Sequence, residues 1–336
     1  MRAKVDFKLW SGIAVSLFFM ALLFKKIDFR LLGEALRSAD YRLVFLAICF
    51  TFISYFLRAV RWRYLLISEK NIPLSSLYSA TIIGYMANNL LPARLGELVR
   101  AHSLAQREQL KTPAVFASLV IDRLFDGFTV LLMLLMTLYT IKLPVGMEDA
   151  ALALRGGGVI MFLIYCGVML FLYVLKLHTM RTLSVVGYVL KPFPRRFSDT
   201  LIPLLGSFIG GIRLSPRRWH FVAVCAASAA IWLLCLMSVD VTLLSFNIHL
   251  PVTASIFILI LLVFAVMVPA SPGYIGTYHY ACYKGLSVFG IPETTSVSIA
   301  LIMHAIGFFP VIIVGLYYLW KNKISLNELQ KVEKAR

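Results

Sequence analysis

The sequence contains few charged residues, and most of them are basic. Only 15% of the 336 residues are charged, whereas 60% are hydrophobic. Because soluble domains are usually only about 45–50% apolar, the composition argues against a soluble enzyme. Lys and Arg number 33 against 16 Asp and Glu, a formal charge of +17. Apolar runs too long for a nucleic-acid-binding surface interrupt these charges, so we predict anionic membrane lipids, and no nucleic acid, as the partner.

Motifs for metal, nucleotide and covalent catalysis are also missing from the sequence. The five cysteines occur singly, without a CxxC pair and without histidines at metal-ligand spacing: Cys49, Cys166, Cys225, Cys235 and Cys282. The chain has no GxxxxGK[ST] loop to bind a nucleotide. We therefore expect buried free thiols, no metal site, no catalytic residues and no cofactor.

Long apolar segments dominate what remains. A membrane-spanning helix needs about 20 apolar residues, so we predict an all-α, polytopic integral membrane helix bundle forming a single domain over 1–336. The expected spans are 9–24, 43–57, 75–91, 116–140, 158–175, 219–246, 252–268 and 296–320. Amphipathic stretches at 28–40 and 177–215 suit helices lying at the interface. The first span resembles a signal peptide, but Lys25 and Lys26 follow it in place of a small-residue cleavage site.

Basic loops predict the orientation. The loop 176–218 is the richest in Lys and Arg, which favours a cytoplasmic position, and the basic tail 321–336 is then cytoplasmic too. Loops 25–42 and 58–70 compete for the inside, so the topology before residue 75 stays open. We expect a multi-pass protein of a bacterial or archaeal cell (inner) membrane.

Two interrupted segments, 88–100 and 269–284, occupy corresponding places in the two halves of the chain. Pro92-x-x-Leu95-Gly96 aligns with Pro272-x-x-Ile275-Gly276, which is a weak internal repeat. Broken helices in lipid are tolerated where the freed backbone groups face protein or a watery cavity, and paired breaks are typical of transporter binding sites. Alternatively, Pro and Gly merely shape a turn between packed helices.

Charged and polar residues around the first break are candidates for substrate binding. Arg94, Glu97 and Arg100 are spaced by three residues and would share one helix face, where the arginines can hold phosphate oxygens and the glutamate can orient them. Asn88 and Asn89 mark the end of the preceding segment. The competing interpretation is a loop with solvated charges.

A charged triplet, Asp122, Arg123 and Asp126, lies inside the apolar segment 116–140. The two aspartates are four residues apart and share a face, and the arginine can pair with a neighbouring helix or with substrate. A purely structural ion pair is the alternative. Five cations could be partners: Arg58, Arg61, Arg63, Arg94 and Arg100.

The second break is followed by aromatic and titratable residues. Tyr274, Tyr278 and His279 are the substrate-binding candidates there, against the alternative of ordinary interfacial aromatics. Two further polar groups lie in apolar segments, Asp240 and His304. Such a histidine more often hydrogen-bonds a neighbouring helix than binds a ligand.

Together these motifs resemble the lysylphosphatidylglycerol synthase transmembrane-region family, also described as flippase-like. The similarity is carried by the ordered run Asn88-Asn89…Arg94…Glu97…Arg100, by Asp122-Arg123…Asp126, and by Pro272-Gly273…Gly276, and it spans roughly residues 8 to 320. It implies an inner-membrane module that moves aminoacylated phosphatidylglycerol between leaflets. Asp122 stands where the family typically has Glu. We expect no counterpart of the soluble aminoacyltransferase domain of the two-domain synthases, so the resemblance does not imply lipid synthesis.

The leading hypothesis is therefore a translocase for an anionic or aminoacylated phospholipid, or a lipid-linked intermediate. One alternative is a membrane-embedded transferase acting on a polyprenyl-phosphate-linked substrate. Another is a scaffold that docks a separately encoded lipid-modifying enzyme through its basic 176–218 region. An oligomer is compatible with the sequence.

Overall fold

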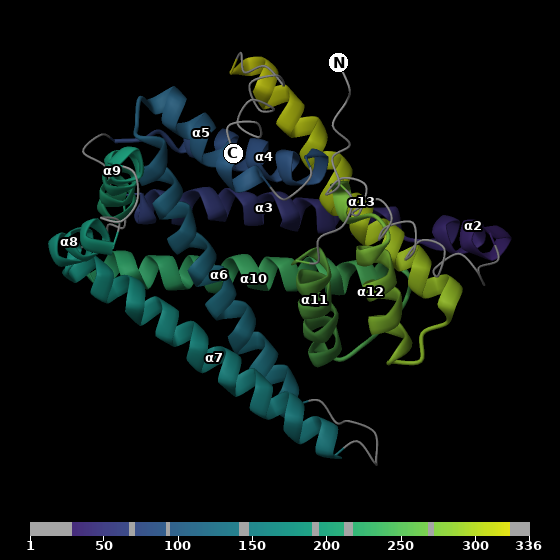
Figure 1. The fold of residues 1–336 in the computed structure, drawn as a ribbon. Helices are drawn as coiled ribbons and strands as arrows, with labels where there is room; N and C mark the ends of the chain where they lie inside the picture. The colour runs from purple at the N-terminus through teal and green to yellow at the C-terminus, as the bar shows by residue number, and fades with distance from the viewer. Residues whose placement is uncertain are drawn as a thin grey trace, which may run out of the picture.

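In the part of the chain that the structure describes, every regular element is a helix. The computed structural model describes residues 29–66, 71–91, 95–140, 148–189, 195–211, 218–267 and 272–322. The elements are α2 (Phe29–Ser38), α3 (Tyr41–Leu65), α4 (Leu74–Leu90), α5 (Gly96–Glu108), α6 (Thr112–Thr140), α7 (Glu148–Leu177), α8 (Thr179–Val189), α9 (Arg195–Gly211), α10 (Arg218–Ser245), α11 (Val252–Met267), η2 (Pro272–Tyr274), α12 (Thr277–Ser287) and α13 (Glu293–Lys321) (Figure 1). This confirms the predicted all-α fold.

Four of these helices contain segments long and apolar enough to cross a membrane: Tyr41–Leu65, Arg155–Val174, Trp219–Ser245 and Glu293–Lys321. Two other predicted spans correspond to shorter helices, α4 with 17 residues and α11 with 16. The predicted span 116–140 falls in α6, which carries the charged triplet. The predicted span 9–24 lies outside the described residues.

Helix α3 extends well beyond its predicted end at Leu57. The sequence placed Arg58, Arg61 and Arg63 at the headgroup level, but the helix continues through all three to Leu65. The first two side chains are buried and only Arg63 is exposed. The helix can carry them because carboxylates of a neighbouring helix neutralise them, which local sequence around α3 does not reveal.

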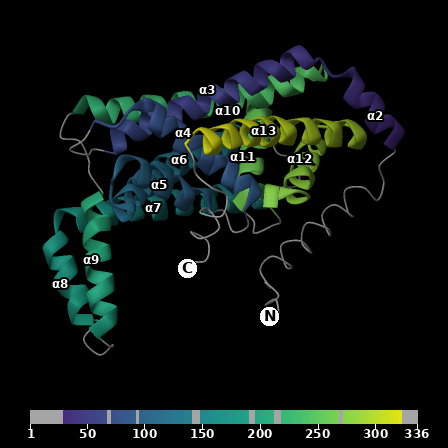
Figure 2. The ribbon, with the colours of Figure 1, turned by 90° about the horizontal axis from the view of Figure 1, so that it is seen from above.

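Apolar packing joins helices within each half of the chain and also across the two halves. Trp62, Leu77, Leu104 and Leu119 belong to one buried cluster that connects α3, α4, α5 and α6. A larger cluster joins α10 to α13 and includes Ile258 of α11. Helices α3 and α10 run side by side in both views, so they tie the two halves together (Figures 1 and 2).

The outer helices α7, α8 and α9 have a different character. α7 packs against α6 but exposes most of its apolar side chains, as expected for a face that contacts acyl chains. α8 and α9 pack on each other, and α9 also packs on α6, while in Figure 2 the pair projects beyond the other described helices. They occupy the region where the sequence predicted interfacial helices.

The first break is held closed by an asparagine and two glycines. The side-chain Oδ1 of Asn88, near the end of α4, accepts a hydrogen bond from the backbone N–H of Gly96 at 2.8 Å. A Cβ on Gly96 would collide with the carbonyl oxygen of Gly84 and with the Asn88 side chain. Only glycine therefore lets α5 start so close to α4.

The second break contains three residues with positive φ. Gly273 has φ 75°, Tyr274 57° and Gly276 94°, directly before α12. Glycine reaches such angles at little cost, whereas Tyr274 is strained. Gly96 and Gly276, which align in the sequence, both stand at the start of the helix that follows their break.

Candidate functional site

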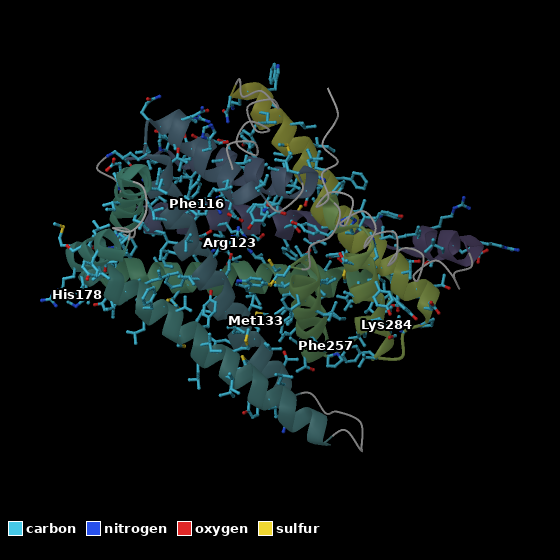
Figure 3. All side chains as sticks on the ribbon, viewed as in Figure 1. Phe116, Arg123, Met133, His178, Phe257 and Lys284 are labelled. Carbon is cyan, nitrogen blue, oxygen red and sulfur yellow. The ribbon has the colours of Figure 1, made fainter. Side chains whose placement is uncertain are left out.

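The charged triplet of α6 forms the centre of a buried ion network. Asp122 and Asp126 lie one turn apart and face α3, from which Arg58 and Arg61 reach them. Arg123, between them, is labelled near the middle of the molecule in Figure 3. Four arginines and three carboxylates join here from α3, α5 and α6.

Asp126 accepts hydrogen bonds from four donors. The Arg58 Nη1 lies 2.7 Å from one carboxylate oxygen, and Arg123 Nη1 lies 3.1 Å from the same atom. Arg61 Nη1 is 2.9 Å from the other oxygen, and the Trp232 indole N–H donates to it at 3.2 Å from α10. This carboxylate thus connects α3, α6 and α10.

Asp122 is fully buried and pairs with two arginines. Arg61 lies 2.8 Å from Oδ1, and Arg100 Nη1 of α5 lies 3.2 Å from Oδ2. Arg61 also donates to the Ser228 hydroxyl at 2.9 Å. Asp122 therefore holds α5 and α3 against α6.

Arg100 is enclosed but incompletely paired. Its guanidinium carbon lies 4.1 Å from the centre of the Trp62 ring, a cation–π contact. The side chain is 1% exposed, yet its Nε and Nη2 have no hydrogen-bond partner among the described residues. Burial of unpaired donors of this kind is unfavourable, so these atoms mark capacity to bind a further acceptor.

The network has one partly open edge, formed by Arg123 and Glu97. Their closest N–O distance is 2.7 Å, and their side chains are 36% and 26% exposed, whereas the others in the network are at most 8% exposed. Arg123 also donates to the Tyr85 hydroxyl at 3.3 Å. In the described structure, Arg123 Nε and Glu97 Oε2 are buried without hydrogen-bond partners.

A second polar cluster surrounds the other break. The Gly276 backbone N–H donates to His279 Nδ1 at 3.3 Å, and His304 Nε2 of α13 lies 2.7 Å from the Gly273 carbonyl oxygen. The two imidazole centroids are 4.7 Å apart, and the Tyr278 ring lies 5.2 Å from that of His304. Two histidines thus hold the irregular backbone before α12.

The two breaks meet in the structure. α4 packs against η2, and the Asn89 carbonyl oxygen lies next to Gly273, 3.6 Å from where a Cβ would stand. The Asn89 side chain donates to the Gly307 carbonyl oxygen of α13 at 3.3 Å. Residues far apart in sequence, Asn89 of α4 and Gly273 of η2, are therefore brought together.

Most predicted candidates fall into these two clusters. Glu97, Arg100, Asp122, Arg123 and Asp126 join the network. Tyr278 and His279 join the second cluster, and Tyr274 lies in the strained turn before α12. Asn88 and Asn89 make hydrogen bonds to backbone atoms of the protein, Gly96 and Gly307 respectively. Arg94 lies outside the described residues.

The remaining polar residues singled out in the sequence have local partners. Arg58 and Arg61 were only possible partners of the triplet and prove to be central to the network. Arg63 instead donates to the Asn71 side chain at 3.2 Å. Asp240 accepts from the Ser255 hydroxyl at 2.9 Å, which joins α10 to α11. His304 makes a hydrogen bond to the backbone of η2, as expected for a histidine that contacts a neighbouring element instead of a ligand.

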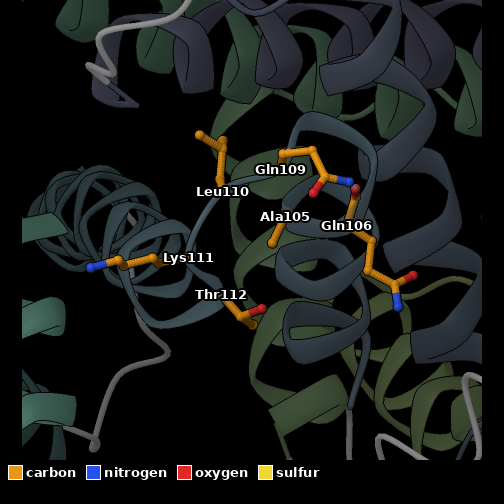
Figure 4. A pocket seen from close by; sticks show the side chains of 6 residues that line it. All are labelled: Ala105, Gln106, Gln109, Leu110, Lys111 and Thr112. Atoms are coloured by element: carbon orange, nitrogen blue, oxygen red, sulfur yellow. Dashed lines mark hydrogen bonds between the residues drawn. The ribbon is translucent and has the colours of Figure 1, made fainter.

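Two surface hollows lie outside both clusters. One, of about 560 Å³, sits at the turn between α5 and α6 and is lined by Ala105, Gln106, Gln109, Leu110, Lys111 and Thr112. In Figure 4 the Lys111 side chain extends away from the two glutamines. The other, of about 370 Å³, is lined by Val60, Arg63, Tyr64, Leu74 and His220. Neither includes a residue of the network.

Comparisons with known proteins agree with a membrane module. The family described as "Lysylphosphatidylglycerol synthase TM region" matches residues 9–315. "Glycosyltransferase AglD" of Haloferax volcanii is 26% identical over 323 residues, covering 88% of this chain and 51% of AglD. A "UPF0104 membrane protein" of Methanothermobacter thermautotrophicus is 25% identical over 295 residues, covering 84% of this chain and 86% of that protein. The chain thus spans about half the length of AglD, and no solved structure matches it.

Proposed function

The chain belongs to the lysylphosphatidylglycerol synthase transmembrane-region family, and we propose that it is a translocase for lipids with an anionic headgroup. The cargo would be an anionic or aminoacylated phospholipid, or a lipid-linked intermediate that carries a phosphate. Its headgroup would pass through the protein while its tails stay in the bilayer.

The observation that carries this proposal is the surplus positive charge of the ion network. Its four arginines face three carboxylates among the described residues. An uncompensated charge away from water is strongly unfavourable, so a network of this kind is stabilised by an additional anion. A lipid phosphate supplies that charge, and the unpaired N–H groups of Arg100 and Arg123 are donors of the type that phosphate accepts.

The division of the network into enclosed and open parts suggests how cargo would enter. Arg58, Arg61, Asp122 and Asp126 are sealed and would serve as a rigid base. Arg123 is partly exposed and pairs with Glu97 of another helix. A headgroup phosphate would displace Glu97 from Arg123, since both are oxyanions that compete for the same guanidinium.

The meeting of the two breaks supports a transport pathway. Irregular backbone within a membrane protein is tolerated where it faces protein or a water-filled path, and paired broken helices are common around transporter substrates. Here the break after Asn89 lies against Gly273 and close to the network. The helix starts at Gly96 and Thr277 would then border the same path.

Reconstitution into liposomes tests the proposal. Fluorescent phosphatidylglycerol would be distributed in both leaflets, and its exposure followed with a membrane-impermeant quencher. We expect the protein to accelerate loss of protected lipid and the Arg123→Gln variant to reduce that rate at least tenfold. Arg155→Gln is the matched control, because Arg155 of α7 donates only to the Leu138 carbonyl oxygen and contacts the Tyr139 ring among the described residues.

The possible results separate the proposal from a structural role of the same arginine. A translocase would be refuted if the wild-type protein left the inner-leaflet lipid inaccessible to the quencher. This result would have to hold for anionic lipids, for zwitterionic lipids and for a polyprenyl phosphate. Equal transport rates for the wild type and Arg123→Gln would show that the headgroup does not pass the ion network. Unfolding curves of each variant in detergent ensure that rates are compared between folded proteins.

The similarity to AglD supports a second candidate, a membrane-embedded transferase acting on a polyprenyl-phosphate-linked substrate. Purified protein in detergent would be given a polyprenyl-phosphate sugar and a soluble acceptor. Transfer of the sugar without any bilayer would favour this candidate, whereas a translocase has no activity there.

A further inference from the structure

The histidine cluster at the second break has hydrogen bonds that define its protonation. His279 Nδ1 accepts the Gly276 N–H, so the neutral ring carries its proton on Nε2. This side chain is 3% exposed, and Nε2 has no partner among the described residues. An imidazole that accepts at one nitrogen must lose that bond when it takes up a second proton.

The groups around His279 offer it no counter-charge. His304 faces it from α13, Tyr278 and Cys282 lie beside it on α12, and Tyr274 lies in the preceding turn. Helix α11, which packs on α12, contains no titratable residue in Val252–Met267. No ion pair joins either imidazole to a Lys, Arg or carboxylate of the described chain. A proton on His279 would therefore be a buried, isolated cation.

Protonation would nevertheless create an anion site. The proton would enter at Nδ1 and release the Gly276 N–H, which then becomes a free donor at the start of the 11-residue helix α12. Protonation adds one N–H donor, at Nδ1, to the one that the neutral ring already carries at Nε2, which has no partner in the described structure. The positive end of the helix dipole disfavours the cation alone but favours an anion beside it. Proton and anion would thus each require the other.

We infer that His279 is the proton-binding site of a proton-coupled translocase, taking up one proton together with the anionic headgroup. The inference rests on the proposed function and adds its coupling ion. The anion neutralises the imidazolium, and the proton leaves Nδ1 when the headgroup departs, which restores the hydrogen bond to Gly276. Helix α4 connects this event to the arginine network, because its Asn89 contacts Gly273 and its Gly84 lies against Arg100.

Transport measured across pH tests the inference. One linked proton makes the affinity for the anionic lipid increase by up to about tenfold for each pH unit of acidification. We expect this dependence in wild-type proteoliposomes between about pH 8 and 5.5. His279→Gln should abolish it, because a glutamine at this helix position can still accept the Gly276 N–H but cannot titrate. His249→Gln is the matched control, since His249 is exposed and precedes α11.

A second readout does not depend on transport. The His279 imidazole resonance is titrated by NMR in detergent, once with short-chain phosphatidylglycerol and once with phosphatidylcholine. Its absence from the spectrum of His279→Gln assigns it. The anionic lipid should raise the midpoint of protonation relative to the zwitterionic one. Identical midpoints, or a wild type whose transport is independent of pH, would overturn the proton site while leaving the translocase intact. A raised midpoint without movement of any lipid would support the proton site and refute the translocase.

Discussion

The charge balance of the buried network makes Asp126 the most informative position for a stability measurement. Asp126→Asn retains the shape of the side chain but removes its negative charge. The carboxylate now accepts from three arginines and from the Trp232 indole. Its loss raises the surplus of positive charge in the described network from one to two, at a place that is at most 8% exposed.

Removing one partner from a buried ion pair is destabilising by about 3 to 5 kcal/mol. For a chain of 336 residues that corresponds to a fall in Tm of roughly 4 to 7 °C. Thermal unfolding in detergent, followed by intrinsic fluorescence, measures the change. Glu34→Gln is the control: its pair with Arg30 is exposed, so the expected loss is below about 0.5 kcal/mol.

A double variant distinguishes charge balance from loss of hydrogen bonds. Arg58→Met combined with Asp126→Asn removes one charge of each sign and returns the surplus to one. Because apolar groups can replace a buried pair at little cost, the double variant should be more stable than Asp126→Asn alone. A double variant that loses the sum of both single effects would refute the reasoning, and so would an Asp126→Asn protein as stable as the Glu34→Gln control.

Three further changes probe the packing around the breaks and the triplet. Gly96→Ala should lower stability by about 1 to 3 kcal/mol in thermal unfolding, because the new Cβ meets the Gly84 carbonyl oxygen. Gly33→Ala is the control and should not lower stability, because there is open space around Gly33. Asn88→Ala removes the acceptor for the Gly96 N–H and should cost about 1 kcal/mol in the same assay, with restored stability in Asn88→Asp. Tyr165→Phe loses the hydrogen bond from its hydroxyl to the Leu124 carbonyl oxygen, so unfolding should become easier by about 1 kcal/mol; no change would show that water replaces this bond.

Much of the fold could be predicted from local sequence. Apolar runs of membrane length require helices, since a backbone in lipid must satisfy its own hydrogen bonds. Each predicted span among the described residues falls on a helix, although α3 and α7 are longer than predicted. The breaks at Pro92 and Pro272 were also visible, because proline removes a backbone donor and glycine loosens the chain. Proline alone is not decisive, since Pro310 lies inside α13 without interrupting it. The end of α3 was not, since Arg58 and Arg61 resemble headgroup anchors until their partners are known.

For the candidate site, too, the sequence predicted the residues but not their partners. The sequence determined which polar residues stand in apolar surroundings: the triplet of α6, Glu97 and Arg100, and the histidines after the second break. It also implied that such charges need partners. Neither periodicity nor spacing within a segment could tell which arginine faces which aspartate.

Only the tertiary structure decided those pairings. The crossing of α3, α5 and α6 encloses Arg61 and Asp122 and leaves Arg123 with Glu97 at the open edge. The packing of α4 on η2 brings the two breaks together across most of the chain length. The physical reason is that helix formation depends on residues within a few turns, whereas the partner of a buried charge is chosen by which helices pack side by side.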